Sequence, residues 1–270
     1  MSKRWGAALA FGLLTTLCWA QKPTVGENGV VNGATFIPFG QPGHANAPGS
    51  IVSIFGTNFA SSLALASSVP LSTSLGGVSV TFSGVPTPLF VVSPGQINAQ
   101  LPFGLTGDTT TIVVTNGSGA SDPRQIQIGP FSPGIFTDPP GGAGQGIVVF
   151  ALEPTVFAAV PSQRLPSARP AKAGEYLTIY CNGLGAVQPA VASGNAAPAT
   201  PPLAETTTKP VVTIGGLQSD VLFSGLVPGL VGLYQINLQV PTGVTKGNTV
   251  PLQIQMGNVT TSAAVTIAIQ

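Results

Sequence analysis

Charged residues are scarce in this sequence, and their scarcity excludes several classes of protein. Asp, Glu, Lys and Arg make up only 6% of the 270 residues, against about 25% in an average soluble protein. The formal net charge is +1, with nine basic side chains spread along the chain. A nucleic-acid binder needs a dense cationic surface, so we predict no nucleic-acid partner. The hydrophobic fraction of 43% also argues against charge-rich disorder.

Histidine and cysteine are nearly absent, which leaves little material for catalysis or metal binding. His44 is the only histidine and lies in a turn-like segment, so we expect a surface loop residue rather than a catalytic base. One histidine and two cysteines cannot supply the three or four ligands of a zinc site. A calcium site stays open only if Asp108, Asp122 and Asp138 meet by folding. We therefore predict no catalytic residue, no metal and no cofactor, and expect no enzyme.

The first 20 residues predict a cleaved secretory signal peptide. Lys3 and Arg4 form a positive start, residues 5–17 are apolar, and Ala20 precedes the expected cleavage site. A retained membrane anchor is disfavoured because the apolar run is shorter than the ~20 residues that span a bilayer. Lipidation at Cys18 is a minor alternative. We predict a secreted or cell-envelope protein with no membrane span after cleavage.

Cleavage would also remove both tryptophans and one of the two cysteines. Cys181 would then be alone, so no internal disulfide can form. No cationic residue is adjacent to it in sequence, and it follows an apolar strand, so we expect it to pack as a small hydrophobe. The protein must therefore rely on its hydrophobic cores for stability.

The rest of the sequence is present in two copies. Three blocks match in the same order, and their spacing grows by seven residues twice, as expected where loops lengthen and strands do not. The matched blocks are 48–59 with 173–184 (offset 125), 80–85 with 212–217 (offset 132) and 96–102 with 235–241 (offset 139).

Each copy has a β pattern and no convincing helical stripe. Val52 and Ile54 share one strand face, as do Leu177 and Ile179, and these faces are predicted to fill the cores. Rows of Gln and Asn occupy the opposite face of 96–100 and 235–239. Many short strands with frequent Gly and Pro turns predict two tandem antiparallel β-sandwiches of immunoglobulin-like type.

The expected organisation is a signal peptide at 1–20, a first sandwich at 28–129, a linker at 130–146 and a second sandwich at 147–270. The linker contains GGAGQG, which imitates a phosphate-binding loop, but prolines precede it and no helix follows. Residues 188–210 are predicted to form a long surface loop. A terminal strand at 262–269 is expected to be an exposed edge unless something covers it.

Two stretches resemble known families. PGSIVSIFGTNF at 48–59 resembles the opening of IPT/TIG immunoglobulin-like domains. The second half is similar to the Solibacter-type uncharacterised C-terminal domain. Its matching segments are AGEYLTIYCNGLGAV (173–187), VTIGG (212–216), FSGLVPGLVGLYQINLQVP (223–241), VTIAIQ (265–270), FSPGIFT (131–137) and GQG (144–146). The resemblance implies an immunoglobulin-like fold and export, and it implies no established activity.

Three aromatic residues form the candidate contact surface. Tyr176 and Tyr180 share the strand face opposite Leu177, and Phe55 holds the matching position in the first copy. These rings could contact a partner. Burial under a loop or at the junction of the two sandwiches is the plainer interpretation of the same pattern.

Two functional hypotheses follow. The first is an exported, non-enzymatic structural or interaction module, a spacer or adhesion-type pair whose partner is an unknown protein or glycan at the cell exterior. The second is a weak carbohydrate-binding module, which the loss of both tryptophans disfavours because glycan sites rely on exposed aromatic rings.

Overall fold

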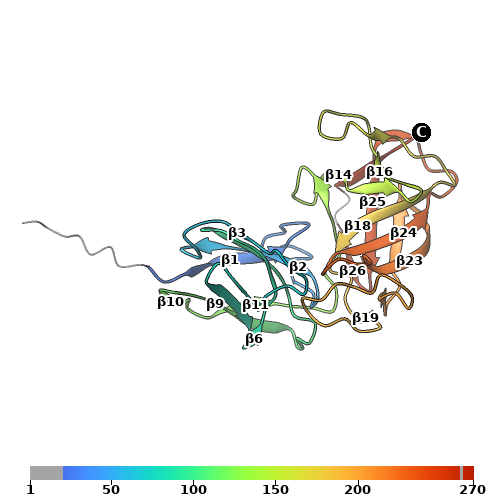
Figure 1. Cartoon of the computed structure of the whole chain (residues 1–270). Coiled ribbons are helices and arrows are strands. Elements are labelled where there is room, and N and C mark those ends of the chain that lie inside the picture. Colours follow the sequence, from blue (N-terminus) through green and yellow to red (C-terminus); the bar gives the residue numbers. More distant parts are fainter. Residues whose placement is uncertain (1–20, 262–263) are drawn as a thin grey trace, which may run out of the picture.

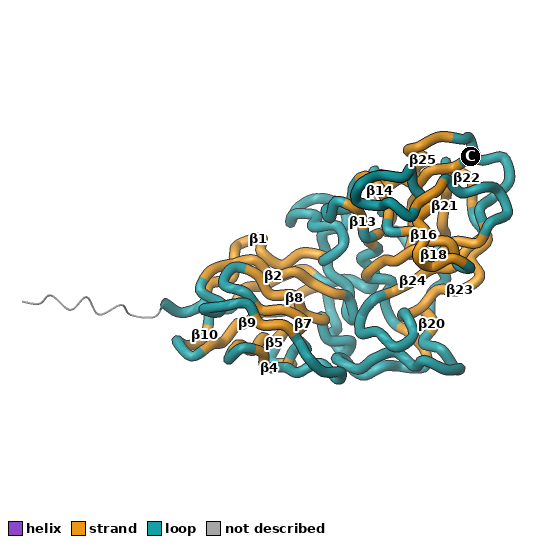
Figure 2. The backbone as a smooth tube through the Cα atoms, turned by 45° about the horizontal axis from the view of Figure 1, so that its top comes forward, coloured by secondary structure: helices purple, strands orange, loops and turns teal. Residues whose placement is uncertain are grey.

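The computed structural model describes residues 21–261 and 264–270, which form two β-sheet lobes joined end to end (Figure 1). Strands and loops account for all of these residues, so the chain is all-β as predicted (Figure 2). This part of the chain accordingly contains no helix long and apolar enough to cross a membrane. The predicted signal peptide lies outside the described residues.

The first lobe is a sandwich of two antiparallel sheets. One sheet has the order β1-β2-β8-β7-β3, and the other has β10-β9-β5-β4 with β11 on β9 and β6 on β5. Val52 and Ile54 are fully buried between them, which confirms the predicted core face. The strands are β1 (Thr24–Asn32), β2 (Ile51–Thr57), β3 (Ala64–Leu65), β4 (Ser74–Leu75), β5 (Val78–Phe82), β6 (Val85–Pro86), β7 (Leu89–Val92), β8 (Gln96–Gln100), β9 (Thr109–Asn116), β10 (Gly119–Ala120) and β11 (Arg124–Gln127).

The second lobe is a larger sandwich. Its sheets have the orders β17-β16-β15-β18-β24-β23-β20-β19, with β12 on β18, and β13-β14-β27-β25-β21-β22, with β26 on β25. Leu177 and Ile179 lie in its core, also as predicted. The strands are β12 (Gly134–Ile135), β13 (Thr137–Asp138), β14 (Gly144–Gly146), β15 (Val148–Phe150), β16 (Glu153–Ala158), β17 (Ala168–Arg169), β18 (Tyr176–Asn182), β19 (Val187–Gln188), β20 (Glu205–Thr206), β21 (Val211–Ile214), β22 (Leu217–Gln218), β23 (Asp220–Leu226), β24 (Tyr234–Gln239), β25 (Gly247–Met256), β26 (Val259–Thr260) and β27 (Val265–Ile269).

The two sandwiches repeat each other in strand register. Ile51 of β2 lies opposite Gln100 of β8, and Tyr176 of β18 lies opposite Gln239 of β24. These partners are related by the offsets of 125 and 139 residues found in the sequence. The opposite sheets repeat in the same way, with β5 on β9 and β21 on β25. The duplication predicted from sequence is confirmed.

Equivalent side chains make equivalent contacts. The Ser53 hydroxyl donates to Asn98 Oδ1 at 3.1 Å, and the Thr178 hydroxyl donates to Asn237 Oδ1 at 3.0 Å. The residues that alternate with the Gln/Asn rows, such as Ile97 and Ile236, face the cores and are buried. Because one strand pairing is built twice, positions in the two sandwiches can be compared residue by residue.

The expected linker at 130–146 is not a free connector. β12 pairs with the end of β18, and β14 runs parallel to β27 in the opposite sheet. In the first sandwich, β1 pairs with β2 along the corresponding edge and is interrupted only by a bulge between Val25 and Val30. Gly and Pro suit edge strands and bulges as well as linkers, so composition alone could not distinguish them.

Two other loop predictions have different outcomes. Part of 188–210 is a loop, but it also contains β20 and contacts the first sandwich through Gly194. The terminal strand begins at Val265, and Ser262 and Ala263 lie outside the described residues. This strand is not an exposed edge, because it lies between β14 and β25.

The core of the second sandwich buries two polar groups. Cys181 is fully buried and unpaired, so it packs as the predicted small hydrophobe. Burial raises the pKa of its thiol well above the ordinary value, which makes it unreactive. The neighbouring Tyr234 is also buried, and its hydroxyl donates to the Gly185 carbonyl at 2.6 Å. That bond provides the partner a buried phenol needs.

Candidate interaction surface between the sandwiches

A buried network of amide side chains joins the two sandwiches. Asn182, at the end of β18, accepts from the Ile51 amide at 2.9 Å and donates to the Ile51 carbonyl at 2.8 Å. Its Nδ2 also donates to Asn32 Oδ1 at 2.9 Å. Asn32 in turn donates to the Ser132 carbonyl at 2.7 Å. We call Asn32, Ile51, Ser132 and Asn182 the junction network.

The side chains of the junction network are buried and hydrogen-bonded. Asn32, Ser132 and Asn182 are at most 2% exposed. The Asn182 amide uses both of its donors and its acceptor, and Asn32 Oδ1 also accepts from the Ala34 amide at 2.8 Å. A satisfied polar network in a low-dielectric site permits few alternative arrangements. Its hydrogen bonds link residues of the first sandwich to residues of the second.

A second contact comes from the long loop of the second sandwich. The Gly194 amide donates to Gln100 Oε1 at 2.6 Å, and its carbonyl accepts from the Leu71 amide at 2.8 Å. Gly194 has φ of +85°, and a Cβ there would lie 3.0 Å from Pro88. Only glycine combines this backbone with so close an approach. The loop thus inserts its backbone into the first sandwich.

An open groove of about 840 Å³ lies between the sandwiches. Its volume falls in the range of ligand pockets. None of its lining side chains belongs to Asp, Glu, Lys, Arg or His. We call this the junction groove, and it is lined by Ile51, Ala66, Ser67, Ser68, Val69, Leu71, Phe90, Phe136, Ile147, Tyr180, Gly229, Leu230, Val231 and Leu233.

The structure separates the three predicted contact residues. Tyr180 lines the junction groove. Tyr176 lies toward the other end of β18 and is 45% exposed. Phe55 is 38% exposed on the first sandwich, where its ring lies 6.1 Å from that of Phe36. The strand pattern correctly placed them on one kind of face, but they do not form one surface.

Four residues of the junction escaped the sequence analysis: Asn32, Ser132, Asn182 and Gly194. Asn182 precedes Gly183, a pattern that is typical of a turn, and Ser132 lies within the predicted linker at 130–146. One signal in the sequence was Gln100. It belongs to a row of amide side chains that recurs in both copies, and such a row indicates that its members have hydrogen-bond partners.

The candidate catalytic and metal groups lie apart from the junction groove. His44 Nε2 is 2.6 Å from Gln127 Oε1. Hydrogen bonds from Lys22 and Arg164 lower the pKa values of Asp122 and Asp138, respectively. Within residues 21–261 and 264–270, no group of three His, Cys, Asp or Glu is placed to hold a metal ion.

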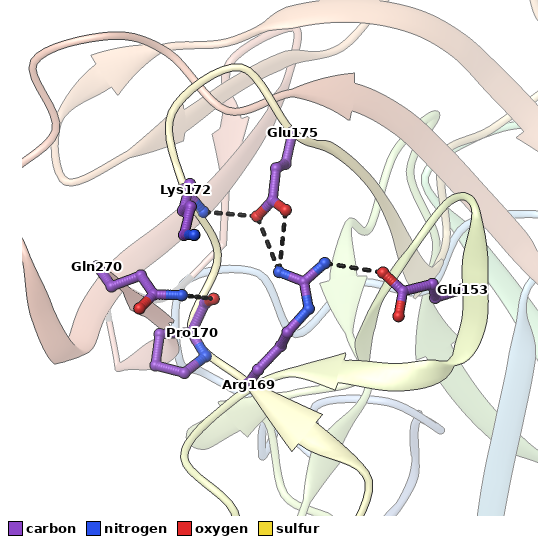
Figure 3. Close-up of polar contacts among 6 residues, drawn as sticks. All are labelled: Glu153, Arg169, Pro170, Lys172, Glu175 and Gln270. Atoms are coloured by element: carbon purple, nitrogen blue, oxygen red, sulfur yellow. Dashed lines mark hydrogen bonds and ion pairs between the residues drawn. The ribbon is translucent and has the colours of Figure 1, made fainter.

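An ionic cluster covers the far end of the second sandwich. The Arg169 guanidinium donates to Glu175 at 2.9 Å and to Glu153 at 2.8 Å (Figure 3). It also lies 3.6 Å from the centre of the Phe150 ring. Hydrogen bonding to Glu153 is the main cause that raises the pKa of Arg169. Phe150 of the second sandwich and Asn32 of the first hold the same register position. The second sandwich therefore has an ionic cluster where the first has the Asn32 amide of the junction network.

Comparisons with solved structures found matches of low similarity. Solved structures with similar arrangements include SGBP-B of the Bacteroides ovatus mixed-linkage glucan utilization locus in complex with a heptasaccharide (14% identity, TM-score 0.32, 84% of this chain and 42% of that one). Others are SGBP-B from a Bacteroides uniformis xyloglucan locus (13%, 0.26, 91% and 48%) and domains 5–6 of the S-layer protein SbsC (11%, 0.27, 92% and 98%). The chain spans less than half of either SGBP-B, and TM-scores this low carry no argument about function.

No curated protein matches the sequence. The IPT/TIG domain model matches residues 41–128, which lie within the first lobe, while the Solibacter-type resemblance stays a prediction. The protein thus consists of immunoglobulin-like β-sandwiches, the first of which is similar to IPT/TIG domains.

Proposed function

We propose that this protein is a non-enzymatic structural and interaction module that acts outside the cytoplasm, as a rigid spacer or adhesion-type unit. The observation that carries the proposal is the junction network. The Asn182 side chain is buried, and all of its polar atoms bond to the first sandwich. Such a contact favours one orientation of the two sandwiches over free movement about a linker.

Export and the absence of catalysis belong to the same proposal. The expected signal peptide at 1–20 and the lone, buried Cys181 suit a protein that folds outside the cytoplasm without disulfides. Its only histidine is engaged with Gln127 and Gln41 in a loop. The organisation we propose is a first sandwich over 28–129 and a second over 147–270, with the intervening strands belonging to the second.

Rigidity can be measured directly with two spin labels. Ser118→Cys and Thr245→Cys place exposed thiols on the first and second sandwiches. We expect one narrow distance distribution, because the junction network allows one arrangement. The control is the protein without residues 1–20, which contain Cys18, and without the two added cysteines. It should take up no label, because Cys181 is fully buried and burial raises the pKa of its thiol. A broad or multiply peaked distribution would reject the rigid-spacer proposal.

Carbohydrate binding is a second candidate, favoured by the aromatic rings of the junction groove. Phe90, Phe136 and Tyr180 line it together with the side chains of Ser67 and Ser68. Rings can stack on sugar faces while hydroxyls bond to sugar hydroxyls. The many aliphatic side chains of the groove favour weak binding at most.

A glycan array tests this second candidate. We expect any neutral glycan that binds to be lost on Tyr180→Ala and retained on Tyr176→Ala, because only Tyr180 lines the junction groove. Equal loss in both variants, or no binding to any glycan, would remove carbohydrate binding and leave the spacer proposal standing.

A further inference from the structure

Because the two sandwiches repeat each other, each has two equivalent ends. The internal junction occupies one end of the first sandwich and the opposite end of the second. At the junction, Ile51 of the first sandwich and Tyr180 of the second both line the groove. The register gives their equivalents: Tyr176 stands where Ile51 does, and Phe55 stands where Tyr180 does. The chain therefore carries a second, unused set of the residues that meet at its own junction.

Both unused residues are large and exposed. Tyr176 is 45% exposed and Phe55 is 38% exposed, whereas Ile51 is half-buried at the junction. Phe55 and its neighbour Thr57 form what we call the free end of the first sandwich. Tyr176 and Gln239 form the free end of the second, and Phe150 lies buried in the core beside them.

The hydrogen-bonding side chain of the junction is duplicated as well. Gln100 Nε2 donates to the Gly49 carbonyl at 3.3 Å, and Gln239 Nε2 donates to the Gly174 carbonyl at 2.9 Å. Both glycines have positive φ, +86° and +85°. Gln100 Oε1 accepts from the Gly194 amide, whereas Gln239 Oε1 has no hydrogen-bond partner among the described residues. The Gln239 side chain is thus held in place by its Nε2, while its Oε1 can still accept a hydrogen bond.

The free ends lack the amides that make the internal junction permanent. Thr57 stands at the position of Asn182, and Phe150 stands at the position of Asn32. The Arg169 guanidinium covers the Phe150 ring. Glu153 and Glu175 both accept hydrogen bonds from this guanidinium (Figure 3). A contact between free ends would therefore rest on aromatic side chains and one amide, so it would be weaker than the junction and reversible.

We propose that a second copy of this chain docks head to tail. The free end of the first sandwich of one copy meets the free end of the second sandwich of another, with Phe55 beside Tyr176 and an amide of the arriving chain bonded to Gln239. This rests on the proposed function, since it gives the interaction module its partner. The two contacting surfaces differ, so the contact is heterologous and extends into open chains.

Sedimentation of the purified protein up to about 1 mM tests the proposal, because weak reversible contacts form in that range. The average mass of the intact protein should rise with concentration beyond that of a dimer. Phe55→Ser and Tyr176→Ser should each weaken association at least tenfold. Leu217→Ser is the matched control, because Leu217 is 40% exposed on the opposite sheet and should leave association unchanged.

Mixing the two variants is the decisive measurement. Phe55→Ser protein still offers Tyr176, and Tyr176→Ser protein still offers Phe55, so the mixture should form dimers and nothing longer. An intact protein that stays monomeric, a mixture that does not associate, or equal weakening by Leu217→Ser would overturn head-to-tail docking. A monomer that keeps its narrow spin-label distance would show that the rigid-spacer proposal survives.

Discussion

Replacing Asn182 with alanine is expected to separate the two sandwiches into independently moving units. The substitution leaves the Ile51 amide without its partner and removes a donor from Asn32 Oδ1. Unsatisfied buried polar groups cost about 1–3 kcal/mol each. We therefore expect the junction to lose about 3 kcal/mol, which is a large part of the stability of a typical domain.

Two measurements check this expectation. The distance distribution between labels at residues 118 and 245 should broaden, and denaturant unfolding should separate into two transitions. Separate transitions are possible because the hydrophobic cores of the two sandwiches are distinct. Each can unfold alone once the junction is weak.

Thr57→Ala is the matched control for Asn182→Ala. Thr57 occupies the same register position in the first sandwich, but it is exposed, and its strand partner, Thr24, belongs to the same sandwich. Its substitution should change the free energy of unfolding by less than about 0.5 kcal/mol. If Asn182→Ala left both the distance distribution and the single transition intact, the remaining contacts, at Gly194 and between Asn32 and Ser132, would be enough to hold the sandwiches.

Alternation of residue type was enough to predict the strands and their core faces. Val52 and Ile54, with polar or exposed neighbours, could fill a core only as a strand, because a one-residue shift would expose both. The repeat made the prediction stronger, since Leu177 and Ile179 show the same alternation. The offsets related equivalent positions of the two copies, while the pairing of strands within each copy came from the structure.

The junction could not be predicted in the same way. Asn182 bonds to Ile51, 131 residues away, and nothing local distinguishes such an asparagine from one that closes a turn. Gly194 lies in an Ala- and Pro-rich stretch whose composition indicates a loop but not what the loop touches. Long-range polar contacts depend on the angle between the sandwiches, which the strand pattern does not contain.

The duplicated turn after β2 and β18 shows how one backbone accommodates different side chains. Asn58 and Gly183 follow these strands with φ of +59° and +70°, a conformation both residues tolerate. Before them, Gly56 in the first sandwich corresponds to Cys181 in the second, and after them Phe59 corresponds to Leu184. The first copy therefore combines the small Gly56 with the large Phe59. The second copy combines two residues of intermediate size, Cys181 and Leu184.

This pairing predicts a strong effect at Gly56. A Cβ at this position would lie 2.0 Å from the Thr24 carbonyl oxygen and 2.4 Å from the Phe59 ring. Overpacking of this kind costs about 1–3 kcal/mol and occasionally more. Since part of the clash is with backbone, we expect Gly56→Ala to lower the free energy of unfolding of the first sandwich by about 3 kcal/mol, measured by denaturant unfolding.

Adding Phe59→Leu should recover part of that loss. Phe59→Leu alone should destabilise by leaving a cavity in the core. In the double variant the smaller side chain gives the new methyl group room, so the double loss should be at least about 1 kcal/mol less than the sum of the single losses. Recovery should be incomplete, because the Thr24 carbonyl on β1 must still move.

Gly95→Ala is the matched control in the same turn region. A Cβ there would meet only the Gly56 carbonyl oxygen at 3.5 Å, an ordinary contact, so the change should be small. Strictly additive losses for Gly56→Ala and Phe59→Leu would show that the Thr24 carbonyl alone sets the cost. In that case the size of residue 59 would not affect the cost of a side chain at position 56. Cys181 would then be tolerated because β12 leaves more room beside it than β1 leaves beside Gly56.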